Sequence, residues 1–156
     1  MSRVRPPWYF GLVWASYVVA LGLGSAAADD RKPAAPKLDG KWVYESQVIG
    51  GRKLSQTRLD EIWVEIKDGS FFRCGKSGLH QELRLALDPA RKPAEFTLVF
   101  KHPVTGKVSE TKGIYKFDGD RLTLSYDNSG QTRPAKFESP EGRDEIVLSV
   151  LKRSKE

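Results

Sequence analysis

Few residues of this chain have the chemistry of a metal site or a nucleophile. There is one cysteine, Cys74, and there are two histidines, His80 and His102. Cysteine and histidine both bind zinc, and together they can form a nucleophile pair. Cys74 and His80 flank the turn-like sequence GKSGL, so their side chains could meet. No second residue stands at a zinc-binding spacing, so we predict no metal site, and His102 before Pro103 fits a turn.

Two other polar motifs allow a functional and a structural interpretation. Asp118 and Asp120 flank a glycine, but the spaced acids and closing glutamate of a calcium loop are missing, which favours a hairpin tip. Arg133 precedes Pro134, and its planar guanidinium could bind an anionic ligand. It could equally pair with a neighbouring acid or bind backbone carbonyls, and we favour this structural role. No nucleophile elbow, phosphate loop or dinucleotide fingerprint is present, so the sequence predicts no enzyme and no cofactor.

The elements that must position these residues are strands, because apolar residues recur with a period of two. The alternating positions are Trp42, Tyr44 and Val48; Ile62, Val64 and Ile66; Leu83, Leu85 and Leu87; Phe96, Leu98 and Phe100; Tyr115 and Phe117; Leu122, Leu124 and Tyr126; Ile146, Leu148 and Val150. Glycine, proline and aspartate separate these runs. The pattern predicts an all-β fold, a sandwich or an antiparallel barrel, with one short helix around 54–61.

The stretch 112–137, KGIYKFDGDRLTLSYDNSGQTRPAKF, has turn and strand-breaking residues at the spacing typical of a small β-fold. Asp118-Gly119 between two apolar runs predicts a hairpin, since glycine accepts the positive φ of tight turns. Gly113 inside a strand predicts a bulge or a close backbone approach. Pro134 cannot donate to a sheet, so we expect it to start a strand or to lie at an edge.

The N-terminal residues have the order of a secretory signal peptide. Arg3 and Arg5 precede the uncharged apolar run 8–23, and three alanines end at Ala28. An uncleaved membrane anchor is the alternative, but the run is short for a membrane span. We therefore predict a signal peptide at 1–28, export to the periplasm or the medium, and no membrane span after processing.

The rest of the chain divides simply. We predict a flexible lead-in at residues 29–37, DDRKPAAPK, because this segment is polar and contains two prolines. We predict one domain at residues 38–153 and a C-terminal tail at residues 154–156. The net charge of the 156 residues is +6, and it is +4 without residues 1–28. Basic and acidic residues alternate without a basic stripe between aromatics, which indicates no nucleic-acid partner. A single cysteine excludes an internal disulfide framework.

The motifs together resemble a known family. The stretch 112–137, the sequence EIVLSVLKR at 145–153, LDGKW at 38–42, IGGRKL at 49–54 and LALDPARKPAEFTLVF at 85–100 follow one another in the order of the planctomycete uncharacterised, lipocalin-like domain. The resemblance covers essentially all of 38–153, and the combination of motifs is specific. Ser125 departs from it, because members often carry cysteine there. The resemblance implies a small lipocalin-like barrel of about eight strands in an exported protein, and no assigned activity or ligand.

One feature of lipocalins proper is also present. Gly40-Lys41-Trp42 has the Gly-x-Trp form that opens lipocalin barrels, in which a basic residue near the last strand covers the tryptophan. Arg153 is the candidate here, so we expect Trp42 and Arg153 to close the barrel by a cation–π contact.

The barrel interior defines the remaining hypotheses. We expect Leu83, Ile146 and Leu148 to point inward beside the candidate ligand-binding residues, which are Tyr44, Leu85, Phe96, Leu98 and Tyr115. A barrel of eight short strands either holds one small ligand or is filled by its side chains. Two functions remain open: a binding module for a small apolar ligand or an envelope partner, and a structural or interaction domain with a filled core.

Overall fold

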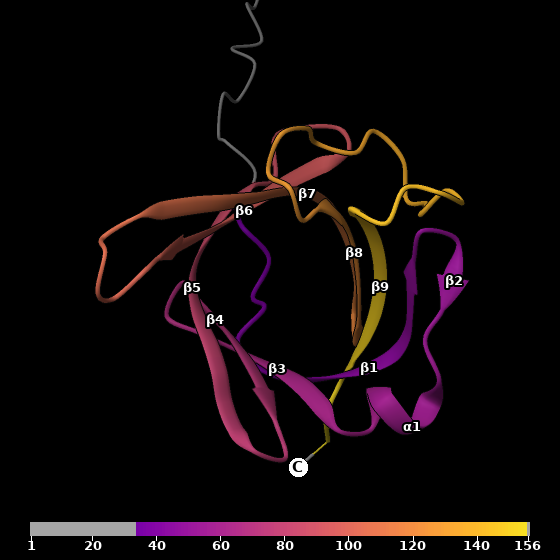
Figure 1. Ribbon diagram of the computed structural model, residues 1–156, viewed down its shortest axis with the longest axis horizontal. Helices are drawn as coiled ribbons and strands as arrows, with labels where there is room; N and C mark the ends of the chain where they lie inside the picture. The colour runs from indigo at the N-terminus through magenta and orange to yellow at the C-terminus, as the bar shows by residue number, and fades with distance from the viewer. Residues whose placement is uncertain (1–33, 156) are drawn as a thin grey trace, which may run out of the picture. The chain divides into compact units, whose positions relative to one another are not determined.

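The computed structural model describes residues 34–155, and their strands form a closed, eight-stranded antiparallel barrel (Figure 1). The elements are β1 (Gly40–Ile49), β2 (Arg52–Lys53), α1 (Gln56–Leu59), β3 (Ile62–Lys67), β4 (Ser70–Gly75), β5 (Gly78–Asp88), β6 (Ala94–Lys101), β7 (Val108–Asp118), β8 (Arg121–Asp127) and β9 (Ile146–Arg153). From β3 to β9 each strand pairs with the next. β1 lies between β3 and β9 and closes the barrel, while the short β2 pairs only with β1. The predicted all-β, lipocalin-like barrel is confirmed.

The core fills the barrel with alternate residues of every long strand, as the period of two predicts. Leu83, Phe96 and Leu98 are among its buried members, and Leu85 and Phe100 pack against them. The short helix also lies where the sequence places it. α1 buries Leu59 against the barrel, which is the position expected from the interval 54–61.

The expected phase of the last strand is wrong. Leu124 and Tyr126 belong to the core, and their partners across the sheet are Ser149 and Val147. Ile146 and Leu148 therefore point outward. The pattern IVLSVL is apolar on both faces, because the loop after β8 covers the outer face of this strand, where the Ser139 hydroxyl donates to the Ile146 carbonyl at 2.6 Å.

The first strand changes phase for a different reason. The register of β1 against β9 shifts between Tyr44 and Ser46, as at a β-bulge. Beyond the shift Gln47 is buried and its amide donates to the Ser149 hydroxyl at 2.9 Å. The expected alternation, with Val48 on the inner face, therefore fails after Tyr44.

Two further sequence expectations need correction. The strand β4 was not among the predicted apolar runs, because Phe72 on its outer face breaks the alternation of apolar and polar residues. Pro134 does not start or border a strand. It lies in the loop 128–145, which contains no strand. Hydrogen bonds from and to side chains hold this loop, in place of the backbone hydrogen bonds between paired strands.

The stretch 112–137 otherwise behaves as predicted. β7 and β8 are joined through Gly119, whose φ is 63°. Gly113 sits at a close approach: an added Cβ would lie 2.4 Å from the Phe96 ring and 2.6 Å from the Ser125 carbonyl oxygen. Only glycine fits there without a shift of its neighbours.

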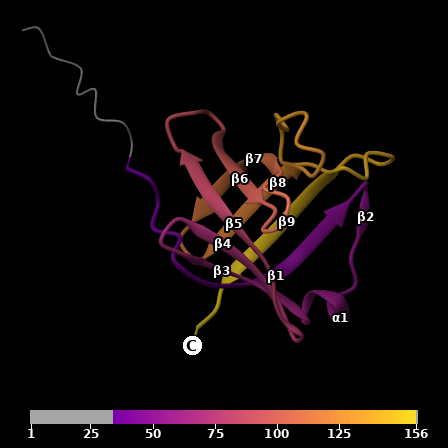
Figure 2. The same cartoon turned by 60° about the vertical axis from the view of Figure 1, so that its left-hand side comes forward.

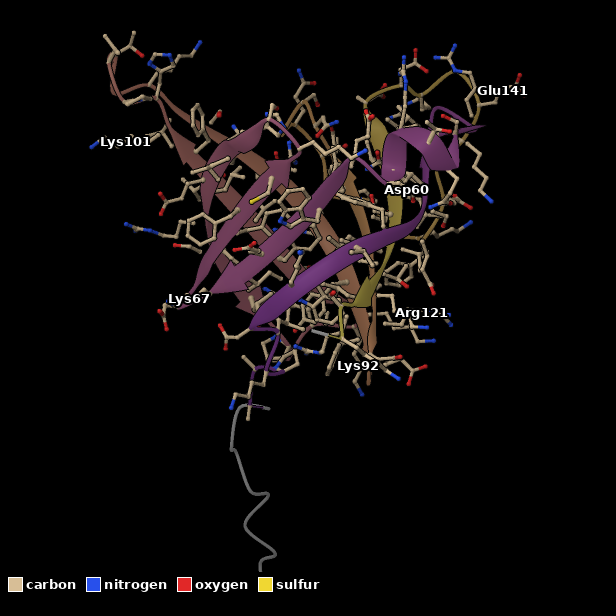
Figure 3. All side chains as sticks on the ribbon, turned by 90° about the horizontal axis from the view of Figure 1, so that it is seen from below. Asp60, Lys67, Lys92, Lys101, Arg121 and Glu141 are labelled. Carbon is tan, nitrogen blue, oxygen red and sulfur yellow. The ribbon has the colours of Figure 1, made fainter. Side chains whose placement is uncertain are left out.

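The barrel has two ends of different construction. The closed end comprises the segment 37–40, the β3–β4, β5–β6 and β7–β8 connections and the end of β9. The open end comprises α1, the β4–β5 turn, the β6–β7 loop and the loop 128–145 (Figure 2). Figure 3 shows Lys67, Lys92 and Arg121 toward the closed end, and Asp60, Lys101 and Glu141 toward the open end.

The predicted signal peptide at 1–28, the first part of the lead-in and Glu156 lie outside the described residues. Within 34–155 no helix has the length and apolar character needed to cross a membrane.

Candidate functional site

The closed end contains the predicted contact between Trp42 and Arg153. The two residues pair directly across β1 and β9, and the Arg153 guanidinium carbon lies 4.4 Å from the centroid of the Trp42 ring. Trp42 is fully buried. Gly40 has a φ of 130°, and an added Cβ there would lie 2.9 Å from the guanidinium, so the glycine of the Gly-x-Trp motif makes room for this arginine.

The same two side chains hold the segment that seals this end. The Trp42 indole donates to the Leu38 carbonyl at 2.8 Å, and Leu38 is buried in the core. Arg153 donates to the carbonyls of Asp39 and Lys37, the latter at 3.0 Å. The contact therefore fixes three backbone groups of the entering chain as well as covering the indole.

The barrel interior next to this seal is almost full. The internal space lined by Leu85, Phe96 and Tyr115, among others, offers about 10 Å³ to the centre of a water molecule. Leu98 is 1% exposed within the same core. Pockets that hold drug-sized ligands have volumes of about 300–1,000 Å³. The predicted ligand-binding side chains are thus brought together, but they pack against one another.

Tyr115 is the polar exception in this apolar interior. Its hydroxyl is buried and has no hydrogen-bond partner among the described residues. Burial raises the pKa of the phenol, and the charge of Asp88 raises it further. This hydroxyl is the atom that would orient a small ligand if the interior opened.

The inner wall toward the open end is more polar. Tyr44 lies there near Tyr126 and Arg73: burial raises the pKa of its phenol well above the usual range, Tyr126 adds to this, and the positive charge of Arg73 opposes it. Arg73 donates to the Gln81 side chain at 3.5 Å. Tyr44 is the one predicted ligand-binding residue that also borders a surface cleft.

Arg133 has the structural role that the sequence favoured. Its guanidinium donates to the carbonyls of Phe96 and Gly113 and to the Thr97 hydroxyl at 3.1 Å, and it pairs with Glu95 at 3.2 Å. These contacts tie the loop 128–145 to β6 and β7. They occupy the planar fork that an anionic ligand would need.

Asp127 anchors the start of the same loop. Burial alone would raise the pKa of its carboxyl, but the side chains and backbone amides of Ser129 and Thr132 donate to it at 2.5–3.0 Å. These bonds outweigh burial and lower its pKa from 3.8 to about 2. The carboxylate is therefore a fixed structural acceptor rather than a proton donor.

The cysteine and histidines are separated into unrelated contacts. Cys74 pairs with Leu79 across the β4–β5 hairpin, and burial, then the charge of Glu65, raises the pKa of its thiol. The His80 ring lies 3.3 Å from the Ser77 hydroxyl. His102 accepts at Nδ1 from two amides of its own turn, at 3.2 and 3.3 Å, as a turn residue does. Residues 34–155 contain no cluster of three or more side chains that could hold a metal ion.

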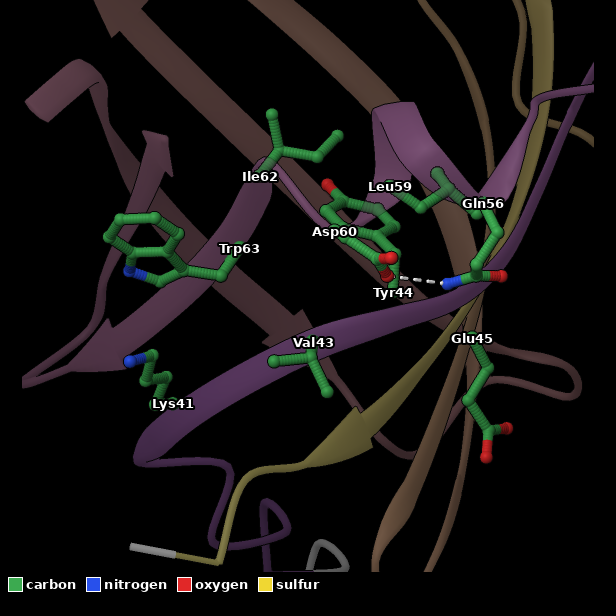
Figure 4. Close-up of a pocket in the computed structure, with 9 residues that line it drawn as sticks. All are labelled: Lys41, Val43, Tyr44, Glu45, Gln56, Leu59, Asp60, Ile62 and Trp63. Atoms are coloured by element: carbon green, nitrogen blue, oxygen red, sulfur yellow. Dashed lines mark hydrogen bonds between the residues drawn. The ribbon is translucent and has the colours of Figure 1, made fainter. Parts of the chain in front are cut away.

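A surface cleft of about 720 Å³ opens between β1, β3 and α1 (Figure 4). The pairing of β1 with β3 ends at Val43 and Trp63, so the two strands separate beyond this pair. At one end of the cleft the Lys41 ammonium lies 5.1 Å from the Trp63 ring centroid. At the other, Gln56 donates to Asp60 at 2.8 Å, the dashed line in Figure 4.

The cleft continues into an apolar line on the outer surface. Val43, Trp63, Cys74 and Leu79 are successive partners across β1, β3, β4 and β5, and we call these four residues the outer row. Val43 is 38% and Leu79 is 61% exposed. The sequence analysis missed this surface, although Trp63 stands on the polar side of its alternating run and signalled an exposed aromatic.

The polar groups of the cleft are largely paired within the protein. No histidine or cysteine lines it. Its Glu45 carboxylate accepts from Arg121 at 2.8 Å and 3.2 Å, and its Asp60 accepts from Gln56. Protein-binding surfaces typically have apolar side chains within a polar rim, and Val43 and Trp63 lie here among such polar groups.

No known protein family, curated protein or solved structure matches this chain in the comparisons. The resemblance to the planctomycete lipocalin-like domain therefore stays a prediction from the sequence motifs, and the site is interpreted from its own geometry.

Proposed function

We propose that this chain is an exported, non-enzymatic domain of the cell envelope, whose filled barrel is a scaffold and whose outer surface binds another protein. The observation that supports this best is the contrast in available space. The interior offers about 10 Å³, whereas the cleft beside Trp63 offers about 720 Å³. A ligand of fatty-acid size does not fit the interior without displacing core side chains.

The outer row supports a protein as the partner. Tryptophan is enriched among the few residues that dominate the binding energy of interfaces, and Trp63 lies half-buried beside the exposed Val43. Lys41 lies over Trp63, and the Trp63 indole donates to Glu65 at 3.1 Å, so the ring is held in place before binding. A positioned anchor loses little conformational freedom when a partner covers it.

Site-directed photo-crosslinking in the native cells tests the surface. A photoreactive amino acid in place of Trp63 should give one discrete crosslinked product, and the same residue in place of the exposed Lys116 on β7 should not. Equal products from both positions, or none from position 63, would contradict the proposed interface.

A small apolar ligand is the second candidate, and the unpartnered Tyr115 hydroxyl favours it. Titration with fatty acids, isoprenoids and pigments, followed by Trp42 and Tyr115 emission, separates the two. We expect no saturable change. Saturable binding of one probe per chain would contradict the filled scaffold and indicate a ligand-binding pocket.

A further inference from the structure

Two neighbouring hairpins diverge at the open end of the barrel. β5 pairs with β4 as far as Gly78, with a register shift that leaves His80 out of the pairing, but its pairing with β6 begins only at Arg84 and Val99. β6 and β7 continue beyond this point to the pair Lys101 and Val108. Figure 1 shows the β4–β5 and β6–β7 hairpins pointing in different directions. The first half of β5 is thus a strand edge inside a closed barrel.

The alternation of backbone groups shows which amides face this gap. The Leu85 amide donates to the Gly69 carbonyl at 2.7 Å, so Leu85 and Leu83 direct their backbone groups toward β4. Glu82 directs its N–H and C=O to the other side, toward β6. On β6 the His102 amide donates to the Lys107 carbonyl at 2.8 Å, so the neighbouring Lys101 directs its backbone groups toward β5.

A groove of about 840 Å³ lies between these edges, and Leu79 on one side and Val99, Phe100 and Val108 on the other line it together with polar and charged side chains. Leu79 is 61% and Val108 is 55% exposed on its two sides, and Val104 at the tip of the β6–β7 loop is 86% exposed. Four large apolar side chains of residues 34–155 are exposed, and three of them are these. Exposed apolar groups concentrated in one place mark an interaction site.

We propose that this groove accepts an extended segment of another protein, which adds as a strand to the edge of β5 from Gly78 to Leu83. This inference rests on the proposed function and names a second surface and its type of partner. An edge of six residues is about 20 Å long, enough for a short peptide strand. Main-chain hydrogen bonds to an open edge give such a segment its affinity.

The walls of the groove select the form of the partner. A second copy of this chain would have to present β5 together with its paired β4, and the β6–β7 hairpin stands in the way of a second sheet. A single strand without neighbours of its own fits between two walls. The partner is therefore a flexible segment or a chain terminus that becomes ordered when it binds.

The side chains around the groove define the sequence of that segment. Residues on one face of the added strand would meet Leu79 and Val108, and those on the other face would meet Phe100 at the barrel mouth. The face toward Leu79 and Val108 should therefore carry apolar residues at every second position, whereas Phe100 shares the other side of the groove with the polar Gln81. Arg84 and Lys101 line the groove against the single acid Glu82, so an acidic residue beside the apolar run complements the charge.

Selection from a random peptide library on the purified full chain tests the proposal, with the selected peptides as probes. We expect apolar residues at alternate positions and binding of one peptide per chain. N-methylation of the backbone at every second residue should weaken binding about tenfold or more, and N-methylation of the residues between should not. A selection that yields no peptide, or a scan without alternation, would overturn strand addition.

Matched variants locate the binding. Leu79→Ser should weaken the peptide about tenfold, and so should Glu82→Pro relative to Glu82→Ala, because both variants lose the carboxylate and only proline removes the amide that faces the groove. Val43→Ser, at the other exposed apolar side chain, should have no effect. A dimer of this chain that Leu79→Ser dissociates would assign the groove to a second copy and contradict the proposal.

The two proposals can fail separately. Peptides that bind beside Val43 and not at Leu79 would contradict the groove and leave the filled scaffold with its Trp63 interface in place. Saturable apolar ligands inside the barrel would contradict the scaffold even if peptides bind along β5.

Discussion

The closed and open ends of the barrel differ in how much apolar surface they leave exposed. At the closed end Trp42 is fully buried under Arg153, and the carbonyls of Lys37, Leu38 and Asp39 accept from these two side chains. At the open end Leu79 and Val108 are more than half exposed, and the β5 edge has no strand beside it. Burial of apolar surface stabilises a fold, and exposed apolar groups gathered in one place mark interaction sites, which is why we propose a binding groove at the open end.

The comparison predicts that changes at the closed end mainly affect folding. Arg153→Ala removes the cation–π contact and two hydrogen bonds to carbonyls, and should lower the free energy of unfolding by about 2–3 kcal/mol. Chemical denaturation should show it, with a red shift of tryptophan emission. Lys152→Ala is the control, since Lys152 is exposed, and Arg153→Lys should restore the stability only in part because it lacks the planar group. Equal effects at positions 152 and 153 would contradict the closure.

The loop 128–145 depends on Arg133 in a similar way. Arg133→Ala leaves the Phe96 and Gly113 carbonyls without this donor and breaks the pair with Glu95, so we expect a loss of about 2 kcal/mol in thermal or chemical unfolding. The exposed Arg143, in the same loop, should tolerate alanine with little change. If the two variants unfold alike, the loop is not held through Arg133.

Acid should weaken the loop through Asp127. Its folded pKa of about 2 lies below the ordinary value, so the carboxylate stabilises the fold above the unfolded pKa of about 4. This contribution is lost as the pH falls from about 4 to about 2, and it is complete at neutral pH. Asp127→Asn should cost about 1–2 kcal/mol at pH 7 and progressively less below pH 4. A stability difference between the two proteins that does not change with pH would contradict this assignment.

The smallest effect on stability is expected at the open end. Leu79→Ser removes an exposed side chain, so the free energy of unfolding should change by less than about 0.5 kcal/mol. Peptide binding should nevertheless fall sharply, as measured by calorimetry on the same sample. A large loss of stability would show that Leu79 serves the fold and that the two ends do not differ in purpose.

Much of the fold was predictable because alternation and turn residues are local signals. The hairpin at Asp118-Gly119, the tight fit at Gly113 and the pairing of the first strand with the last follow from residue types and order. The cation–π contact was predictable because the closure of a barrel brings those strands together.

The errors arise where long-range packing overrides the local pattern. In β9 the inward Ser149 binds Gln47, and a loop covers the outward Ile146 and Leu148. The polarity of a residue in this strand therefore does not indicate whether it points inward or outward. The bulge after Tyr44 reverses the phase of β1 without a sequence signal. The outer row and the groove arise where two neighbouring strands cease to pair. The periodicity of a single strand does not indicate where this happens.

The central claim is that β5 has one paired and one open edge in the free protein, and amide hydrogen exchange along this strand tests it directly. Glu82 and Leu83 are adjacent on β5, and their amides point in opposite directions. We predict slow exchange at Leu83, which faces β4, and fast exchange at Glu82, which faces the groove, with protection of Glu82 when a selected peptide is bound. Equally slow exchange at both amides in the free protein would show that the edge is closed and would contradict the account.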